Sequence, residues 1–212
     1  MRARALVAVA AGLAVLASSG CKQPTGVEIP QARPSLAGTR LLVVMPTKDY
    51  DRRIYDAVAR ALDEAGASYE VCSSKKGEAV STRGGKVEVT VAPDVDPEPY
   101  AAIVFVGEPG VRALMYDPDL VSLVKGFYAA GKVVAAIHTS AGILGEADLL
   151  RGRTVTAGSE IKAELEAKGA TVTSKPVEVD GQIITAHGPE AAEQFAQTVV
   201  RALSRQRPTS RP

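Results

Sequence analysis

The stretch VVAAIHTSAGILGE, residues 133–146, joins a run of small and β-branched apolar residues to a helix-compatible segment. The apolar run predicts a strand that is buried on both faces. A sharp turn from strand to helix needs small residues two positions before and after its tip, and Ala136 and Ser140 meet this need around His138. Such an elbow raises the side chain at its tip above the sheet, beside backbone N–H groups at the helix start. We therefore place His138 at the tip of a strand-to-helix turn.

Apolar runs alternate with helical patterns along the rest of the chain. Further runs that predict buried strands lie at residues 41–45 and 101–107. Residues 54–65 carry apolar side chains at helical spacing, and Gly66 ends that pattern. A strand, a helix and a strand of these lengths imply a parallel sheet, while the glycine-rich segment before KVEVTV at 86–91 predicts an antiparallel excursion. We predict an α/β fold: a three-layer α/β/α sandwich with a mostly parallel, flavodoxin-like sheet.

The N-terminus has the pattern of a secretory signal. Arg2 and Arg4 precede an unbroken apolar run over residues 5–17, which is short for a membrane span. Small residues then lead to Cys21, which resembles the lipobox of bacterial lipoproteins, where the cysteine is diacylated after cleavage. Ser18 departs from that pattern, because lipoproteins usually have leucine three residues before the cysteine. An ordinary secreted protein or an uncleaved anchor are the alternatives.

The expected organisation is a signal peptide at 1–20, a lipidated Cys21 with a flexible tether at 21–39, a folded domain at 40–205 and a disordered tail at 206–212. The tether is expected because it contains three prolines and has no apolar period. The lipid would make the membrane a partner and place the domain in the bacterial cell envelope, facing the periplasm. Lys22 lacks the acidic retention signal of inner-membrane lipoproteins, which favours the outer membrane.

Composition narrows the class of protein. The chain is 46% hydrophobic and 4% aromatic, so its core is mostly aliphatic. Its 25 basic and 24 acidic residues nearly balance, and no basic stripe with aromatics occurs, which argues against a nucleic-acid partner. If Cys21 is modified, Cys72 has no partner for an intrachain disulfide. Packing must therefore stabilise the fold.

Several ordered blocks across residues 40–204 resemble the ThiJ/PfpI family, which is class I glutamine amidotransferase-like. The most specific block covers residues 131–157, where the strand and its turn are followed by Leu-Leu, Gly-Arg and Val-Thr pairs at 149–156 in the family's LL-GR-VT arrangement. LLVVMPT at 41–47, YAAIVFVGEPG at 100–110 and VDGQIITAHGPEAAEQF at 179–195 also match. The resemblance implies a nucleophilic cysteine with a glutamate partner, and a homodimer.

The departures from the family pattern fall on its chemistry. Aligned by these blocks, the nucleophilic cysteine falls on His138 and the histidine after it on Thr139. The glutamate partner falls on Ile54, and the second glycine of the oxyanion turn falls on Glu108. A reactive thiolate needs both its sulfur and its acidic partner. We therefore expect the family's cysteine chemistry to be absent, which favours a pseudoenzyme, and we expect no cofactor.

The carboxyl ends of parallel strands meet at one rim, where sites of α/β sheets collect. This rule brings together a set of candidate binding residues: Asp49, Cys72, Gly107, Glu108, His138, Thr139 and His187. His138 either fills the vacated position and bonds to Glu108 or the backbone, or it serves as a general base or ligand-binding group. Thr139 is a candidate nucleophile beside it. Cys72 is expected as a buried apolar residue rather than a redox thiol.

No metal site is expected from the spacing. The two histidines could combine with Glu108, Asp49 or Asp51, but their separations match no recognised ligand motif. 

Two functions stay open. One is a non-catalytic domain that binds a small molecule or a protein partner at the rim. The other is a hydrolase or a carbonyl-acting, glyoxalase-like enzyme that uses His138 in place of the cysteine, oriented by Glu108 or Asp49. The enzyme requires a solvent-reachable His138 with an acid within hydrogen-bond distance.

Overall fold

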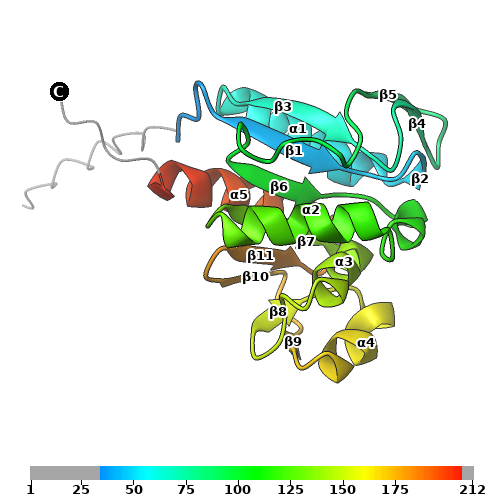
Figure 1. Ribbon diagram of the computed structural model, residues 1–212, viewed down its shortest axis with the longest axis vertical. Helices are drawn as coiled ribbons and strands as arrows, with labels where there is room; N and C mark the ends of the chain where they lie inside the picture. Colours follow the sequence, from blue (N-terminus) through cyan, green and yellow to red (C-terminus); the bar gives the residue numbers. More distant parts are fainter. Residues whose placement is uncertain (1–33, 207–212) are drawn as a thin grey trace, which may run out of the picture. The chain divides into compact units, whose positions relative to one another are not determined.

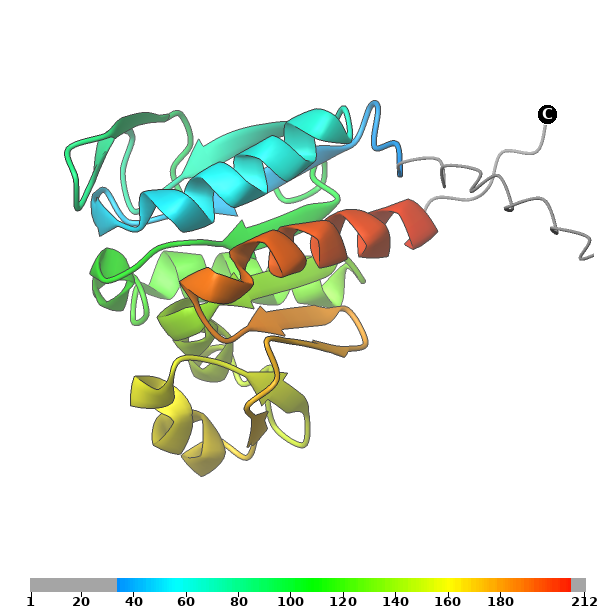
Figure 2. The same cartoon turned by 180° about the vertical axis from the view of Figure 1, so that it is seen from behind.

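A computed structural model describes residues 34–206 (Figures 1 and 2). Its central sheet has six strands in the order β10-β11-β7-β6-β1-β3. These strands are β1 (Arg40–Val44), β3 (Ser68–Cys72), β6 (Ala102–Phe105), β7 (Val133–Ile137), β10 (Val177–Asp180) and β11 (Ile183–Ala186). β10 pairs antiparallel with β11, and the other neighbouring pairs are parallel. The predicted sheet is confirmed.

Helices cover both faces of this sheet. α1 (Arg52–Glu64) and α5 (Ala192–Gln206) lie side by side on one face (Figure 2). α2 (Pro118–Ala129) crosses the other face, next to α3 (Ala141–Glu146) (Figure 1). Each interface has its own apolar core: Phe195 is fully buried on the α1 and α5 side, and Phe127 on the α2 side. The molecule is therefore the three-layer sandwich expected from the sequence.

Local sequence signals determine where the long helices begin and end. The Asp51 carboxylate accepts a hydrogen bond from Arg53 N at 2.8 Å and caps α1. Gly66 follows this helix with a φ of 73°, a left-handed conformation that glycine adopts without strain. α2 begins in the same way, with Asp117 as its cap and Pro118 in its first turn.

Two smaller sheets flank the central one. β2 (Lys48–Tyr50), β4 (Gly77–Ser81) and β5 (Lys86–Val89) form the predicted excursion, in which β4 and β5 are antiparallel. β8 (Thr154–Thr156) and β9 (Thr171–Thr173) form a parallel pair, joined through a chain segment that contains α4 (Lys162–Ala167). Short 3-10 helices lie at Gly110–Ala113, His138–Ser140, Ser159–Ile161 and Pro189–Ala191. Three of these short helices begin at or near the carboxyl end of a strand of the central sheet.

The packed domain begins earlier in the chain than residue 40. Leu36 is fully buried in the core, and its N–H donates to Ala65 O at 2.7 Å. The expected tether therefore ends before Leu36, because an apolar side chain inside the core fixes the backbone beside it. At the other end α5 continues to Gln206. The expected signal peptide, Cys21 and the tail beyond residue 206 lie outside the described residues.

The arginine of the Gly-Arg block has a structural role. Arg153 Nη1 donates to Asp180 Oδ1 at 2.7 Å, and Nη2 bonds to the Tyr128 hydroxyl. The other Asp180 oxygen accepts from Thr154 N at 3.0 Å. These contacts hold β8 against the hairpin of β10 and β11 and so position the segment that follows β8.

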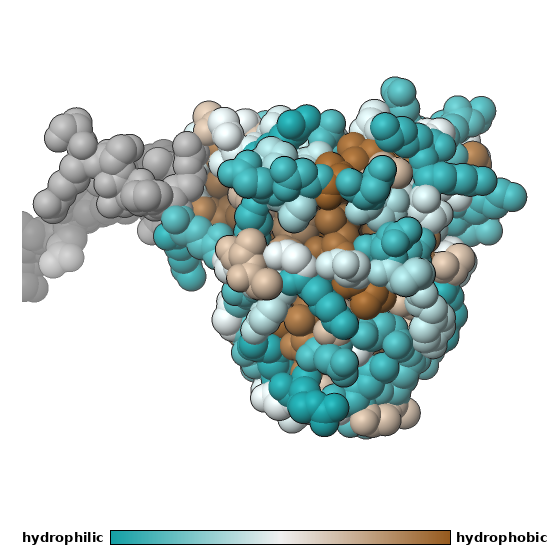
Figure 3. Space-filling model, in the orientation of Figure 1, coloured by the Kyte–Doolittle hydropathy of each residue, from teal (hydrophilic) through white to brown (hydrophobic). Residues whose placement is uncertain are grey.

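The face seen in Figure 3 is mostly hydrophilic, with apolar residues visible in patches between polar side chains. In the described part of the chain, the large hydrophobic side chains with high exposure are Tyr116 and Val179. No helix between residues 34 and 206 has the length and apolar character needed to cross a membrane.

Candidate functional site

His138 lies at the tip of the turn between β7 and α3. β7 ends at Ile137, and a short 3-10 helix, His138–Ser140, leads directly into α3. The φ of His138 is 60°, a left-handed conformation that is uncommon for a residue with a Cβ and costs about 1–3 kcal/mol. Ala136 and Ser140, the small residues on either side, are fully buried. The sharp elbow predicted from the sequence is therefore present, and it holds an imidazole at its tip.

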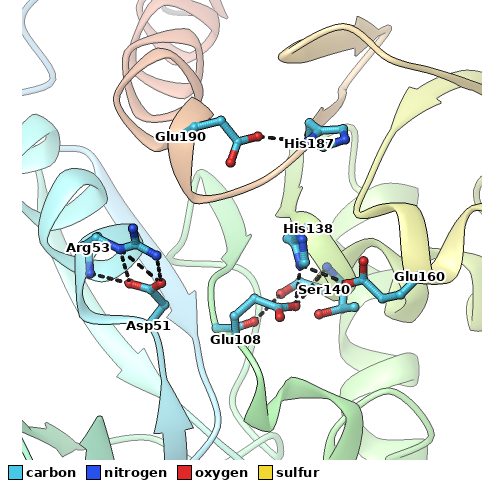
Figure 4. A network of polar contacts seen from close by, with 10 residues as sticks. Asp51, Arg53, Glu108, His138, Ser140, Glu160, His187 and Glu190 are labelled. Atoms are coloured by element: carbon cyan, nitrogen blue, oxygen red, sulfur yellow. Dashed lines mark hydrogen bonds and ion pairs between the residues drawn. The ribbon is translucent and has the colours of Figure 1, made fainter. Parts of the chain in front are cut away.

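Two carboxylates meet one nitrogen of this imidazole. His138 Nδ1 lies 2.8 Å from Glu108 Oε1 and 3.1 Å from Glu160 Oε1 (Figure 4). Glu108 follows β6, and Glu160 belongs to the short 3-10 helix after β8. The Nδ1 atom is buried, and neither oxygen meets the geometry of an aligned hydrogen bond. Charge attraction at short distance therefore dominates these contacts.

The backbone of the turn also holds Glu108. Thr139 N donates to the same Oε1 atom of Glu108 at 3.1 Å. The side chains of His138 and Glu108 are 20% and 16% exposed, whereas Glu160 is 39% exposed. The cluster is thus fixed on its Glu108 side and accessible to solvent on its Glu160 side.

The surrounding charges set the protonation of His138. Burial disfavours the charged ring, but the nearby carboxylates of Glu108, Glu160 and Glu190 outweigh burial and raise the pKa of His138 above its ordinary value. The folded protein therefore keeps the imidazolium form to a higher pH than an ordinary histidine does. In that form the ring is a cation and a proton donor rather than a base.

The second histidine lies close to the same site. His187 Nδ1 is 2.8 Å from Glu190 Oε1, and hydrogen bonds from the Glu190 backbone and from His187 lower the pKa of that carboxyl (Figure 4). A Cβ placed on Gly188 would lie 2.8 Å from Glu190 Oε2 and 3.1 Å from His138 Cδ2. Gly188 therefore separates the two histidine–carboxylate pairs with no side chain between them.

Other members of the expected rim do not join this cluster. Cys72 is fully buried at the end of β3, and burial raises the pKa of its thiol to about 12. Asp49 lines a separate surface groove of about 270 Å³ with Thr47 and Ala113. Asp51 is paired with Arg53 at 2.6 Å at the start of α1. Of the two acids suggested to orient His138, Glu108 does so and Asp49 does not.

Thr139 is not placed as a nucleophile. Its side chain is buried, and within the described residues its hydroxyl has no hydrogen-bond partner. A threonine activated by His138 would need a hydrogen bond to the ring. Its backbone N–H, which orients Glu108, is the part that contributes to the cluster.

Glu160 and Glu190 were not expected from the sequence. They lie 22 and 52 residues after His138, so no local spacing connects them to it. One signal was present: both follow a glycine by two positions, in GSE and GPE, shortly after the β-branched stretches TVTA and IITA. In both places the missing Cβ leaves room for the carboxylate to fold back over the glycine.

Residues 41–202 match the model of the DJ-1/PfpI family over most of the chain. The chain belongs to the DJ-1/PfpI family. This confirms the family resemblance inferred from the sequence blocks. In this DJ-1/PfpI domain, a histidine with two carboxylates is at the tip of the strand-to-helix turn.

Several relatives share this fold along most of their length. The chain is 35% identical to uncharacterized protein MJ0967 of Methanocaldococcus jannaschii, over 82% of this chain and 87% of that protein. It is 25% identical to protein/nucleic acid deglycase 2 of Escherichia coli, over 78% and 98%. The crystal structure of a ThiJ/PfpI domain protein from Brachyspira murdochii is 29% identical and superposes with a TM-score of 0.78, over 81% and 99%.

Proposed function

We propose that this DJ-1/PfpI domain works by binding a ligand at the rim around His138, without the cysteine chemistry described for the family. The observation that carries the proposal is the contact of His138 Nδ1 with Glu108 at 2.8 Å and Glu160 at 3.1 Å. An imidazole with a raised pKa and the partly exposed carboxylate of Glu160 supply binding groups, whereas no thiol lies in the cluster. Cys72, the one cysteine among the described residues, is buried.

The ligand is proposed to be a small molecule, and a protein partner is the alternative occupant of the rim. The full chain is incubated with a metabolite extract, and bound compounds are identified by mass spectrometry. We expect His138→Ala to lose the compounds that the wild type retains. Lys125→Ala, an exposed change on α2, is the control and should retain them. Equal retention by the wild type and His138→Ala would exclude binding at this rim.

We further propose that a lipid on Cys21 holds the domain in a bacterial cell envelope, facing the periplasm. The support is the sequence pattern at residues 1–21, an arginine-flanked apolar run that ends in small residues and a cysteine. Labelled palmitate should be incorporated into the wild type and not into Cys21→Ala. Label in both proteins, or in neither, would contradict the lipid anchor.

An acid–base enzyme is the second candidate, favoured by one specific observation. His138 is 20% exposed and has an acid at 2.8 Å, so it meets the requirement set out for such an enzyme. Purified protein would then turn over methylglyoxal or small esters, with loss of activity in both His138→Ala and Glu108→Gln. The raised pKa of His138 would make it a general acid, so its activity would decline as pH rises. Activity that survives in His138→Ala would eliminate this candidate.

A further inference from the structure

We propose that Glu108, His138 and Glu160 form a binding site for one divalent transition-metal ion, with Zn²⁺ as its probe. The inference deepens the proposed function, since it assigns an ion to the same rim. One ligand atom from each of these three residues lies within 4.8 Å of the other two. The residues are separated by 30 and 22 positions in the chain, so only the fold brings them together.

The spacing of these atoms suits a metal ion with small adjustments. The nitrogen lies 2.8 Å from one carboxylate oxygen and 3.1 Å from the other. Ligands bound at about 2.0–2.1 Å in a tetrahedral site lie about 3.3 Å from one another. Shifts of a few tenths of an ångström would bring both nitrogen–oxygen separations to that value, and the two carboxylate oxygens lie within 4.8 Å of each other. The third residue, Glu160, is the most exposed and can supply most of this movement.

The ligand types select the class of ion. Imidazole nitrogen suits zinc and its neighbours in the transition series, whereas magnesium and calcium prefer sites made only of oxygen. His138 would bind through Nδ1, the atom that faces both carboxylates. Binding displaces the proton from that nitrogen, so the ion takes the place of the proton between His138 and the two carboxylates.

Neighbouring groups orient the ligands on the Glu108 side of the site. Thr139 N–H donates to Glu108 Oε1, which orients this carboxylate toward His138. Glu190 adds negative charge near the ring without touching Nδ1. Three protein ligands with an exposed side leave a further position for water, the arrangement of an open zinc site rather than a closed structural one.

A substitution at Gly158 tests the geometry of the site without removing a ligand. A Cβ on Gly158 would lie 2.5 and 2.6 Å from the two Glu160 carboxylate oxygens. Gly158 has a φ of −58°, which alanine also adopts. Gly158→Ala should therefore push the Glu160 carboxylate away while every ligand residue stays in the chain. A loss of affinity in this variant would report the geometry of the site and not merely its charge.

The experiment titrates chelator-treated full chain with Zn²⁺ by calorimetry, in a Cys21→Ser background that leaves the buried Cys72 as the remaining thiol. We expect one Zn²⁺ per chain. Loss of a group that hydrogen-bonds a metal ligand typically costs about 10–100-fold in metal affinity. Removal of a ligand itself, in His138→Gln or Glu160→Gln, should therefore cost at least about 100-fold. Gly158→Ala should weaken binding as well. Co²⁺ added to the same background should give visible absorption that His138→Gln abolishes.

Glu88→Gln is the matched control, because it removes an exposed carboxylate on β5 and leaves the three ligands intact. It should bind Zn²⁺ with wild-type affinity. No binding by the background protein, or equal binding by His138→Gln, would overturn the metal site. Background protein that binds no Zn²⁺ but still retains metabolites would overturn the metal site alone and leave the proposed function standing.

Discussion

Replacing His138 and Glu108 by glutamine, singly and together, measures how strongly the ion pair at the turn stabilises the fold. Glutamine at 108 keeps an oxygen that can accept from Thr139 N, so that hydrogen bond is retained. Glutamine at 138 keeps a polar side chain without the charge. The double-mutant cycle therefore isolates the attraction between the two side chains.

The structure sets the size of this coupling. Attraction between unit charges 2.8 Å apart is about 1.5 kcal/mol at a dielectric constant of about 80 and about 6 kcal/mol at about 20. Burial of both groups to about four fifths removes them from water and offsets much of the larger value. We expect a coupling free energy of about 2 kcal/mol at pH 6, in the range of charge-assisted contacts.

The coupling should also depend on pH in one direction. The pKa of His138 is raised in the folded state. Its stabilisation is therefore fully present below the unfolded value of about 6.5, and it is lost as pH rises through the higher folded value. The free energy of unfolding of the wild type should approach that of His138→Gln at alkaline pH.

The assay is urea unfolding of the chelator-treated full chain, for the wild type and three variants, across a pH series. The chain contains only two histidines, so the His138 ring can also be followed by NMR, with His187→Gln to assign the signals. A coupling near zero at pH 6 would refute the assigned ion pair. A coupling that stays constant to alkaline pH would show that the positive charge on His138 is not its source.

Three further outcomes test the packing around the site. Cys72 should resist alkylation in the folded protein at neutral pH and react on unfolding, as followed by mass spectrometry, because it is buried and its thiol pKa is about 12. Gly110→Ala should destabilise the protein by about 3 kcal/mol, since a Cβ would lie 2.0 Å from the backbone oxygen of Lys48. Its control, Gly126→Ala in α2, has 3.8 Å of space and should gain up to about 1 kcal/mol in urea unfolding. Phe195→Ala should cost about 3–5 kcal/mol by the same assay, because the ring is fully buried.

The sequence of this protein predicts most of the scaffold. Continuous apolar runs identify β1, β6 and β7, because strands buried on both faces need no polar alternation. Apolar residues at helical spacing and Gly66 identify α1 and its end. The small residues around His138 predict the turn, and the LL-GR-VT block predicts the family, which the family model confirms.

Some local signals were less complete. The segment after His138 is helix-compatible in sequence, and the structure divides it into a short 3-10 turn and a six-residue α3. The pair of β8 and β9 was not expected as a separate sheet, because strands of three residues carry little pattern. Leu36 was assigned to the tether because three prolines precede it and no apolar period includes it, yet its side chain is in the core.

By itself the sequence determined the layers, the turn and the identity of the residue at its tip. These depend on periodicity and on steric limits that act between near neighbours, so they can be read along the chain. The sequence offered Glu108 or Asp49 as the partner of His138, and only the tertiary structure chose Glu108 and added Glu160 and Glu190. Glu108, Glu160 and Glu190 arrive from loops that follow three different strands, and their placement depends on how those strands pair in space. Charge attraction acts through distance in space rather than along the sequence, so the site's chemistry became visible only in the fold.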